Sequence, residues 1–172
     1  MIKYDIRDIS INDYKKVSEI YNSNCQFLLN HLGVECIDED FVAEEVLTMS
    51  KAGFKSCIII DRENQTLQGV LDYKVGKEVY LSLLMLAADA QGKGIGREIY
   101  SFFETEMVRL ESSSIRIDVV NDYQDNVVPF WERLGFVGCE SVTLNWGNKT
   151  SKAVVMRKSI GKFEFVGDLC KI

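Results

Sequence analysis

The sequence has 172 residues, a length that fits one domain with a sizeable hydrophobic core. Hydrophobic residues make up 47% and charged residues 27% of the chain, and these fractions are typical of a globular protein. The formal net charge of −6 argues against nucleic-acid binding, because such proteins attract phosphate through clustered Lys and Arg. We therefore expect a single domain over residues 1–172 that binds no nucleic acid.

The sequence carries no sign of export or of a membrane span. Its longest apolar run, residues 83–88, is far too short to cross a bilayer, and its start lacks the apolar core of a signal peptide. The cysteines include no Cys-x-x-Cys pair, and their odd number argues against a disulfide framework or a structural zinc site. We therefore expect a cytoplasmic protein with no membrane partner and no metal. The cysteines are Cys25, Cys36, Cys57, Cys139 and Cys170.

The first third of the chain predicts one strand and two helices. Residues 2–7 are typical of a short strand, and Ser10 to Asp13 resembles a capping box at a helix start. Apolar residues then recur at helical spacing until residues 22–24 interrupt them, and a second helix is expected from about Glu39 to Met49. The apolar faces of the two helices are Tyr14, Val17, Ile20 and Tyr21, and Phe41, Val42, Val46 and Met49.

The pattern then changes to the period of strands. Residues 57–60 and 67–75 predict two strands around a polar turn, and Gly76–Lys77 leads into a third strand over residues 79–86. These three strands predict an antiparallel meander. A glycine cluster follows, and then a helix whose expected inward-facing residues are Ile99, Phe102, Phe103, Met107 and Leu110.

The last third of the chain predicts a strand, a helix and two further strands. Residues 115–120 alternate as a strand, and Asn126 is positioned to cap a helix with Pro129 in its first turn, where a missing N–H is tolerated. Two strands are expected at about 136–146 and 152–160. The full order is β-αα-βββ-α-β-α-ββ, which predicts an α/β (α+β) fold with one central mixed sheet flanked by helices.

The segment from Leu84 to Arg97 combines a strand end, a glycine-rich loop and a helix start. Glycines let a backbone approach a ligand closely, and the first N–H groups of a helix are unpaired and carry partial positive charge. Lys93 and Arg97 add positive charge within an acidic protein. The segment therefore predicts a site for a phosphate or pyrophosphate group.

Other glycine motifs fit this loop poorly. A P-loop requires Gly-x-x-x-x-Gly-Lys followed by Ser or Thr, and no Gly-Lys pair of the chain has that spacing. A dinucleotide fingerprint requires Gly-x-Gly-x-x-Gly within a βαβ unit, but position 97 is arginine and a meander precedes the loop. For an isolated motif, a glycine-rich turn without a ligand is the default interpretation, so the decision depends on the rest of the chain.

Two blocks of the sequence resemble one protein family. Residues 91–96, Gln-Gly-Lys-Gly-Ile-Gly, are similar to the Gln/Arg-x-x-Gly-x-Gly/Ala signature of the GNAT N-acetyltransferases. Leu84 and Leu86 stand where that family has the end of its splayed fourth strand. Residues 130–136, Phe-Trp-Glu-Arg-Leu-Gly-Phe, resemble the family's aromatic-pair helix that ends in Gly-Phe. The gap between the blocks and the order of elements also match, so the resemblance implies a GNAT-like sheet and one GNAT-like domain.

The resemblance implies that acetyl-CoA is the co-substrate. In the family, backbone N–H groups of the loop hold the CoA pyrophosphate, and backbone groups at the end of the fourth strand pair with the pantetheine arm and polarise the thioester carbonyl. An acceptor amine then attacks directly in a ternary complex. Carried over to this sequence, the expected cofactor-binding residues are Leu84, Met85, Leu86, Gln91, Gly92, Lys93, Gly94, Ile95, Gly96 and Arg97.

The sequence assigns neither a catalytic acid nor a catalytic base. Trp131 stands where the family often has a tyrosine, and because an indole cannot protonate a thiolate, we interpret Trp131 as a packing residue or a wall of the CoA channel. The family's asparagine aligns with Gln124, which Asn121 and Asn126 flank. His31 is interpreted as a surface or packing residue in the loop between the first two helices. Candidate bases, for each of which a surface role is the preferred interpretation, are Glu78, Tyr80, Ser82 and Asp89.

The function expected from the sequence is transfer of an acetyl group from acetyl-CoA to an amine of an unidentified small molecule or peptide. The acceptor is expected to contact residues 22–37 and the surface near the fourth and fifth strands. An alternative is a catalytically weak CoA-binding or sensor module with the same fold, which the absence of a tyrosine at position 131 favours. A nucleotide-binding protein that uses the glycine loop is a third hypothesis. The sequence does not determine the oligomeric state, and a homodimer is compatible with it.

Overall fold

The computed structural model describes residues 3–161, so Cys170 lies outside the described residues. Within residues 3–161, seven strands form one sheet in the order β1-β2-β3-β4-β5-β7-β6. Neighbouring strands are antiparallel except β4 and β5, which are parallel. The strands are β1 (Tyr4–Asp8), β2 (Lys55–Asp61), β3 (Leu67–Lys74), β4 (Glu78–Leu86), β5 (Ser114–Val120), β6 (Val137–Trp146) and β7 (Lys149–Ser159).

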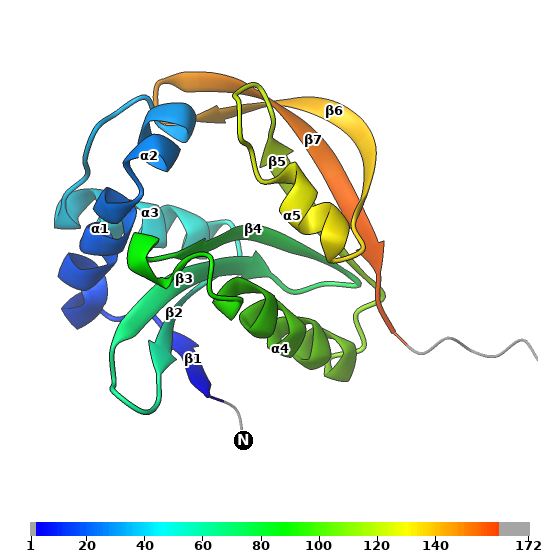
Figure 1. The fold of residues 1–172 in the computed structure, drawn as a ribbon, viewed down its shortest axis with the longest axis horizontal. Helices are drawn as coiled ribbons and strands as arrows, with labels where there is room; N and C mark the ends of the chain where they lie inside the picture. Colours follow the sequence, from blue (N-terminus) through cyan, green and yellow to red (C-terminus); the bar gives the residue numbers. More distant parts are fainter. Residues whose placement is uncertain (1–2, 162–172) are drawn as a thin grey trace, which may run out of the picture.

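Helices cover both faces of the sheet (Figure 1). Two hydrophobic clusters fill the two interfaces, and β2 contributes to both, with Ile58 in the cluster under α1–α3 and Ile59 in the cluster under α4 and α5. No helix within residues 3–161 is long and apolar enough to cross a membrane. The helices are α1 (Tyr14–Ser23), α2 (Cys25–His31), α3 (Glu39–Lys51), α4 (Ile95–Arg109) and α5 (Val128–Arg133), with short 3-10 turns η1 (Ile11–Asp13) and η2 (Ala88–Ala90).

The expected meander and mixed sheet are confirmed, with one additional helix. Residues 22–24 end the first helix as expected, but the chain turns at Asn24 and forms the separate helix α2, where we had expected a loop. The Asn24 N–H donates to the Tyr21 carbonyl at 2.9 Å, and the Asn24 carbonyl accepts from the Leu28 N–H at 3.1 Å. Both backbone groups of Asn24 are thus satisfied by helical turns, so the break does not prevent a second helix from forming.

The inward face of α4 differs in part from the expectation. Ile99, Phe103 and Met107 are buried as expected, but Phe102 is only partly buried and Leu110 is 57% exposed, whereas Tyr100 is buried. The helix ends at Arg109, and Leu110 is its C-cap residue, whose N–H still donates to the Glu106 carbonyl at 3.1 Å.

Both expected caps are present. The Ser10 N–H and Oγ donate to the Asp13 carboxylate at 2.8 and 2.7 Å, which closes the η1 turn before α1. Arg7 also donates twice to Asp13, and its guanidinium holds the pKa of that carboxyl well below the usual range. Asn126 Oδ1 accepts from the first N–H of α5 at 3.1 Å, and Pro129 lies in the first turn of that helix.

Gly69 lies where β3 passes closest to the end of β4. It pairs with Leu86 in the antiparallel ladder. A Cβ atom at Gly69 would collide with the Met85 carbonyl oxygen and would lie 2.9 Å from the Leu86 side chain. Because only glycine permits this approach, Gly69 determines where the last residues of β4 lie.

We expect Gly69→Ala to lower the free energy of unfolding by about 1–3 kcal/mol, the usual cost of overpacking, because the new methyl group must displace a backbone carbonyl. Urea unfolding followed by circular dichroism measures the change. Gly96→Ala is the matched control, because a Cβ there would meet only side-chain atoms of Leu86 and Phe130, at ordinary contact distances from 3.6 Å. Equal stability of Gly69→Ala and the parent protein would contradict the prediction.

Candidate functional site

A bulge in β4 is the first feature of the site. In the ladder with β3, Asp72 is opposite Leu83 and Tyr73 is opposite Leu81, so Ser82 is an extra residue on β4. The extra residue reverses the alternation of side chains, because Leu81 belongs to the cluster under α4 and α5 and Leu83 to the cluster under α1–α3. A bulge of this kind bends a strand and increases its local twist.

The parallel pairing between β4 and β5 stops just before this bulge. Only Glu78, Val79 and Tyr80 pair with β5, opposite Ser114 to Arg116. From Leu81 to the end of β4, the edge that faces β5 has no strand partner among the described residues. Backbone N–H and C=O groups on such an edge are open to a ligand that pairs like an added strand.

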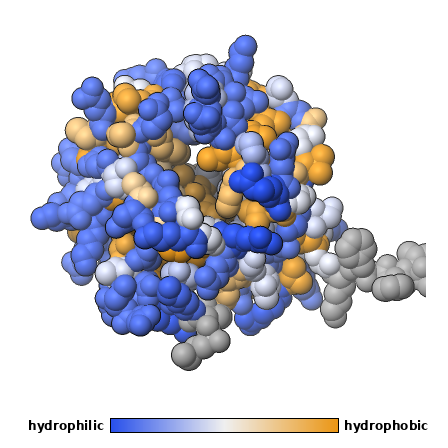
Figure 2. Space-filling view, viewed as in Figure 1, coloured by the Kyte–Doolittle hydropathy of each residue, from blue (hydrophilic) through white to orange (hydrophobic). Residues whose placement is uncertain are grey.

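The divergence of the two strands opens a cleft of about 360 Å³. Its walls include Leu81–Leu84 of β4 and Ile117–Val120 of β5, with Trp131 of α5 at one side and Phe27 and His31 of α2 at another. The space-filling view shows a hollow edged by apolar side chains at this place, between α2 and α5 (Figure 2). The cleft is therefore large enough to hold parts of two substrates, and it is bounded by both sets of helices.

The expected strand–loop–helix segment lies next to the cleft. The chain passes from β4 through η2 and a turn over residues 91–94 into α4. Gly92 and Gly94 have φ values of 72° and 82°, which disfavour residues with a Cβ, and the space where a Cβ would stand is empty at both. Lys93 and Arg97 are exposed beside them. The loop thus presents bare backbone at the start of a long helix, as the sequence predicted.

A polar joint ties this loop to the helices on the other face. The Asn24 amide group donates to the Leu86 carbonyl at 2.9 Å and accepts from Gln91 Nε2 at 2.6 Å. Gln91 Nε2 also donates to the Leu86 carbonyl at 3.0 Å, and the Ala88 N–H donates to Ser23 Oγ at 3.1 Å. The side chain of Gln91 is therefore engaged in holding the end of β4 to the α1–α2 junction.

Among the candidate bases, only Tyr80 and Ser82 line the cleft. The Tyr80 hydroxyl donates a hydrogen bond to Asp118 at 2.9 Å, and burial together with the charge of Asp118 raises the pKa of this phenol well above its usual value. Glu78 is bound to Arg157 at 2.9 Å, at the paired end of β4. Tyr80 is consequently a protonated hydrogen-bond donor at neutral pH and not a base.

The structure changes the interpretation of His31. It is the last residue of α2, not part of a loop, and its half-buried ring lines the cleft. The ring stacks on Phe27 with centroids 4.0 Å apart, and Nδ1 lies 3.0 Å from the Phe27 carbonyl. Since a carbonyl only accepts, Nδ1 carries the proton, and Nε2 of the neutral ring has no hydrogen-bond partner among residues 3–161. Burial lowers the pKa of His31, which favours this neutral form at pH 7.

Sequence reasoning missed three residues that the fold brings to the same end of the cleft. They are Glu45 of α3, Asp72 of β3 and Trp146 of β6. Trp146 Nε1 donates to Glu45 Oε2 at 3.1 Å. Burial raises the pKa of Glu45 and raises the pKa of Asp72 to about 6. No periodic or motif signal marks these positions, because the three side chains meet only through tertiary contacts.

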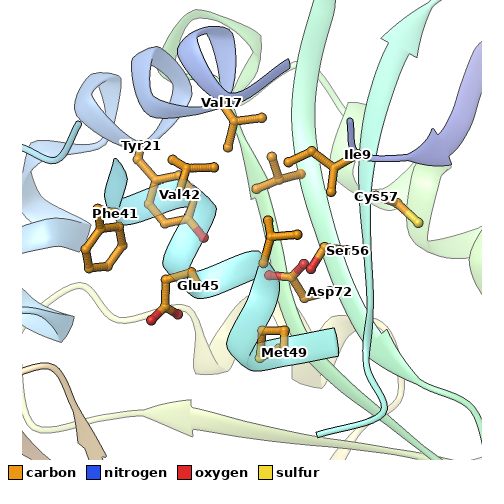
Figure 3. A pocket seen from close by; sticks show the side chains of 12 residues that line it. Ile9, Val17, Tyr21, Phe41, Val42, Glu45, Met49, Ser56, Cys57 and Asp72 are labelled. Carbon is orange, nitrogen blue, oxygen red and sulfur yellow. The ribbon is translucent and has the colours of Figure 1, made fainter. Parts of the chain in front are cut away.

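A second, smaller pocket lies beneath α3 and shares Glu45, Met49 and Asp72 with the cleft (Figure 3). Its volume of about 20 Å³ is enough for about one water molecule, so it cannot hold a substrate. Within residues 3–161, no group of three or more His, Cys, Asp or Glu side chains is arranged to hold a metal ion. Asn121, Gln124 and Asn126 are absent from the described side chains that line the cleft.

Trp131 is both a core residue and a wall of the cleft. It is 7% exposed and makes edge-on contacts with three aromatic rings, at centroid distances of 5.0 to 5.8 Å. The rings are those of Tyr100, Phe130 and Phe136. The packing role expected from the sequence agrees with this position, and the role of Trp131 as a wall of the CoA channel stays a prediction.

Comparison with protein families identifies the class. Residues 26–159 match the family model described as an acetyltransferase (GNAT) domain. This match covers most of the chain, and the chain therefore belongs to the GNAT family of acetyltransferases. Its enzyme class is that of the acetyl-CoA-dependent N-acetyltransferases. Comparison with curated protein sequences finds no match.

Solved structures agree with this assignment at the level of the fold. Spermidine N-acetyltransferase from Vibrio cholerae, solved with CoA and spermine, is 14% identical and has a TM-score of 0.70 over 92% of this chain and 96% of its own. Phosphinothricin acetyltransferase from Sinorhizobium meliloti, solved with acetyl-CoA, is 17% identical with a TM-score of 0.65 over 92% and 89%. An acetyltransferase from Thermus thermophilus is 19% identical with a TM-score of 0.71 over 91% and 97%.

We expect Trp131→Phe to keep most of the acetyltransferase activity, because an indole supplies no proton to a thiolate and phenylalanine retains an aromatic ring in the same wall. The measurement is kcat at saturating acetyl-CoA, with folding checked by circular dichroism. A loss of about a hundredfold or more, the usual worth of acid–base catalysis, would contradict the prediction and would assign chemistry to this position.

Proposed function

We propose that this protein transfers the acetyl group of acetyl-CoA to an amine of a small molecule or peptide by direct attack in a ternary complex. The observation that carries this proposal is the geometry of β4. After Tyr80, the edge of β4 that faces β5 pairs with no strand of the described residues, and the end of β4 leads through the glycine loop into α4. The unpaired strand edge is suited to a pantetheine arm, and the chain leads from this strand to a helix start suited to a pyrophosphate. Membership of the GNAT family supports the same reaction.

The cofactor half of the site consists of residues 84–86 and 91–97. Backbone N–H groups of the loop and of the first turn of α4 bind the pyrophosphate, and Lys93 and Arg97 add charge at its rim. The side chains of Met85 and Leu86 are buried, so these residues act through their backbone. Gln91 differs from its neighbours, because its side chain holds Leu86 and Asn24 and its contribution is to position the loop.

The acceptor enters from the side of α2, and chemistry takes place where β4 and β5 part. The amine nitrogen attacks the thioester carbon, backbone N–H groups of β4 stabilise the oxygen that becomes negative, and the C–S bond breaks to release CoA. An alkylamine has a pKa of about 10.4, so a proton must leave it before or during attack. Water that fills the cleft is the acceptor for that proton.

Two measurements test the proposal in sequence. The first is the melting temperature with millimolar CoA, ATP or NAD, since a ligand that binds only the folded state raises it. The second is CoA release from acetyl-CoA across a panel of amines. Stabilisation by CoA together with acetyl transfer supports the enzyme, whereas binding without transfer to any amine would support the sensor module that Trp131 favours. Stabilisation by ATP or NAD but not CoA would overturn the cofactor assignment.

We expect Gly94→Val to weaken acetyl-CoA binding severely, because a side chain there stands between the loop N–H groups and the pyrophosphate and because valine resists the φ of 82°. Lys93→Ala is expected to cost less, since water and Arg97 partly replace an exposed charge. The dissociation constant of CoA from calorimetry measures both effects.

The control for Gly94→Val is Gly53→Val, at the end of α3. Gly53 has a φ of 83°, so valine is strained there to the same degree, but the position is not among the residues that line the cleft or form the loop. Gly53→Val should lose stability and keep CoA affinity. If Gly94→Val binds CoA as tightly as Gly53→Val does, the loop is only a turn.

A further inference from the structure

Three aromatic rings form one wall of the cleft, which we call the aromatic wall: Phe27, His31 and Trp146. Phe27 and His31 stack on consecutive turns of α2, and Trp146 presents its edge to both, at centroid distances of 5.8 and 6.4 Å. All three residues line the cleft. Aromatic faces of this kind attract cations and the apolar part of a substrate.

Two carboxylates adjoin this wall. The hydrogen bond from Trp146 Nε1 holds Glu45 against the aromatic wall. Asp72 comes from strand β3 and lies close to Ser56. Figure 3 shows both carboxylates from the side of the small pocket beneath α3. In the described part of the chain, neither Glu45 nor Asp72 has a Lys, Arg or His nitrogen within 4.0 Å.

The charges of the cleft do not balance. A third carboxylate, Asp118, is paired with Arg116, which donates to it at 2.8 and 2.9 Å. No Lys or Arg is found among the described residues that line the cleft. The lining therefore holds two carboxylates without a positive partner, and partly buried carboxylates in this situation are stabilised by any cation that reaches them.

We propose that the acceptor is an amine with a second positive charge, and that Glu45, Asp72 and the aromatic wall bind this second charge. The inference rests on the proposed acetyl transfer and specifies its substrate class. The reacting nitrogen must be uncharged when it attacks, so it cannot be the lasting partner of the carboxylates. A second ammonium or guanidinium group can fill that role and leave the first amine free at the thioester. An acceptor that carries a carboxylate at this position meets two like charges and is rejected.

The test compares acceptors of equal length that differ in one terminal group. Linear diamines, the matching monoamines and the matching amino acids, from about three to eight carbons, are assayed with acetyl-CoA by CoA release. We expect kcat/KM for the diamine of the best length to exceed that of its monoamine by about tenfold or more, the worth of one hydrogen bond to a charged group. The matching amino acid should be the poorest of the three.

A pair of variants on α3 tests whether Glu45 causes the preference for diamines over monoamines. Glu45→Gln removes the charge but keeps an oxygen for Trp146, and it should reduce the diamine-to-monoamine ratio by about tenfold. Glu44→Gln makes the same change at the neighbouring position, which does not line the cleft, and should leave the ratio as it is. Equal rates for diamines and monoamines at every length, or an unchanged ratio in Glu45→Gln, would overturn the proposal.

Binding gives a readout that does not depend on transfer. Calorimetry of the diamine series against the protein saturated with CoA should show binding that Glu45→Gln weakens and Glu44→Gln does not. Absence of diamine binding at every length overturns the proposed subsite even if other amines are acetylated. Diamine binding without any acetyl transfer would instead preserve the subsite and contradict the proposed reaction.

Discussion

The site depends on the point at which β4 stops pairing with β5. Strands in a sheet normally satisfy their backbone groups with each other, and an unpaired edge in the middle of a sheet is costly unless something else binds it. Here the extra residue at Ser82 bends β4 just where the pairing with β5 ends. The cleft and the bare strand edge are consequences of this one irregularity.

The separated strands still have to be held at a defined distance. Gly69 allows β3 to follow β4 closely to its end, and the joint of Asn24, Gln91 and the Leu86 carbonyl fastens that end to the α1–α2 junction. The glycine loop and the junction that leads into the helix of Phe27 are therefore joined by direct hydrogen bonds. Geometry of this kind favours a direct reaction, because much of the rate of a two-substrate transfer comes from holding the reactants in place.

Polar groups in the cleft are specialised by their surroundings. Asp118 is paired with Arg116 and accepts a hydrogen bond from the Tyr80 hydroxyl, so these three side chains satisfy one another. His31 is kept neutral by burial, whereas Glu45 has no cationic partner in the described structure. Similar residue types thus differ in chemistry because of what packs against them.

The local pattern of the sequence was sufficient for the order of elements apart from α2, for the caps and for the glycine loop, since each depends on residues close together in the chain. It did not predict the bulge, because Val79, Leu81, Leu83 and Met85 alternate as in a regular strand. In the structure, Leu81 and Leu83 point to opposite faces of the sheet, and both are buried because helices cover both faces. The sequence pattern also did not predict that Glu45, Asp72 and Trp146 line the same cleft. Those side chains come from α3, β3 and β6, and contacts between such distant segments leave no periodic signal in the sequence, so only the tertiary structure decides them.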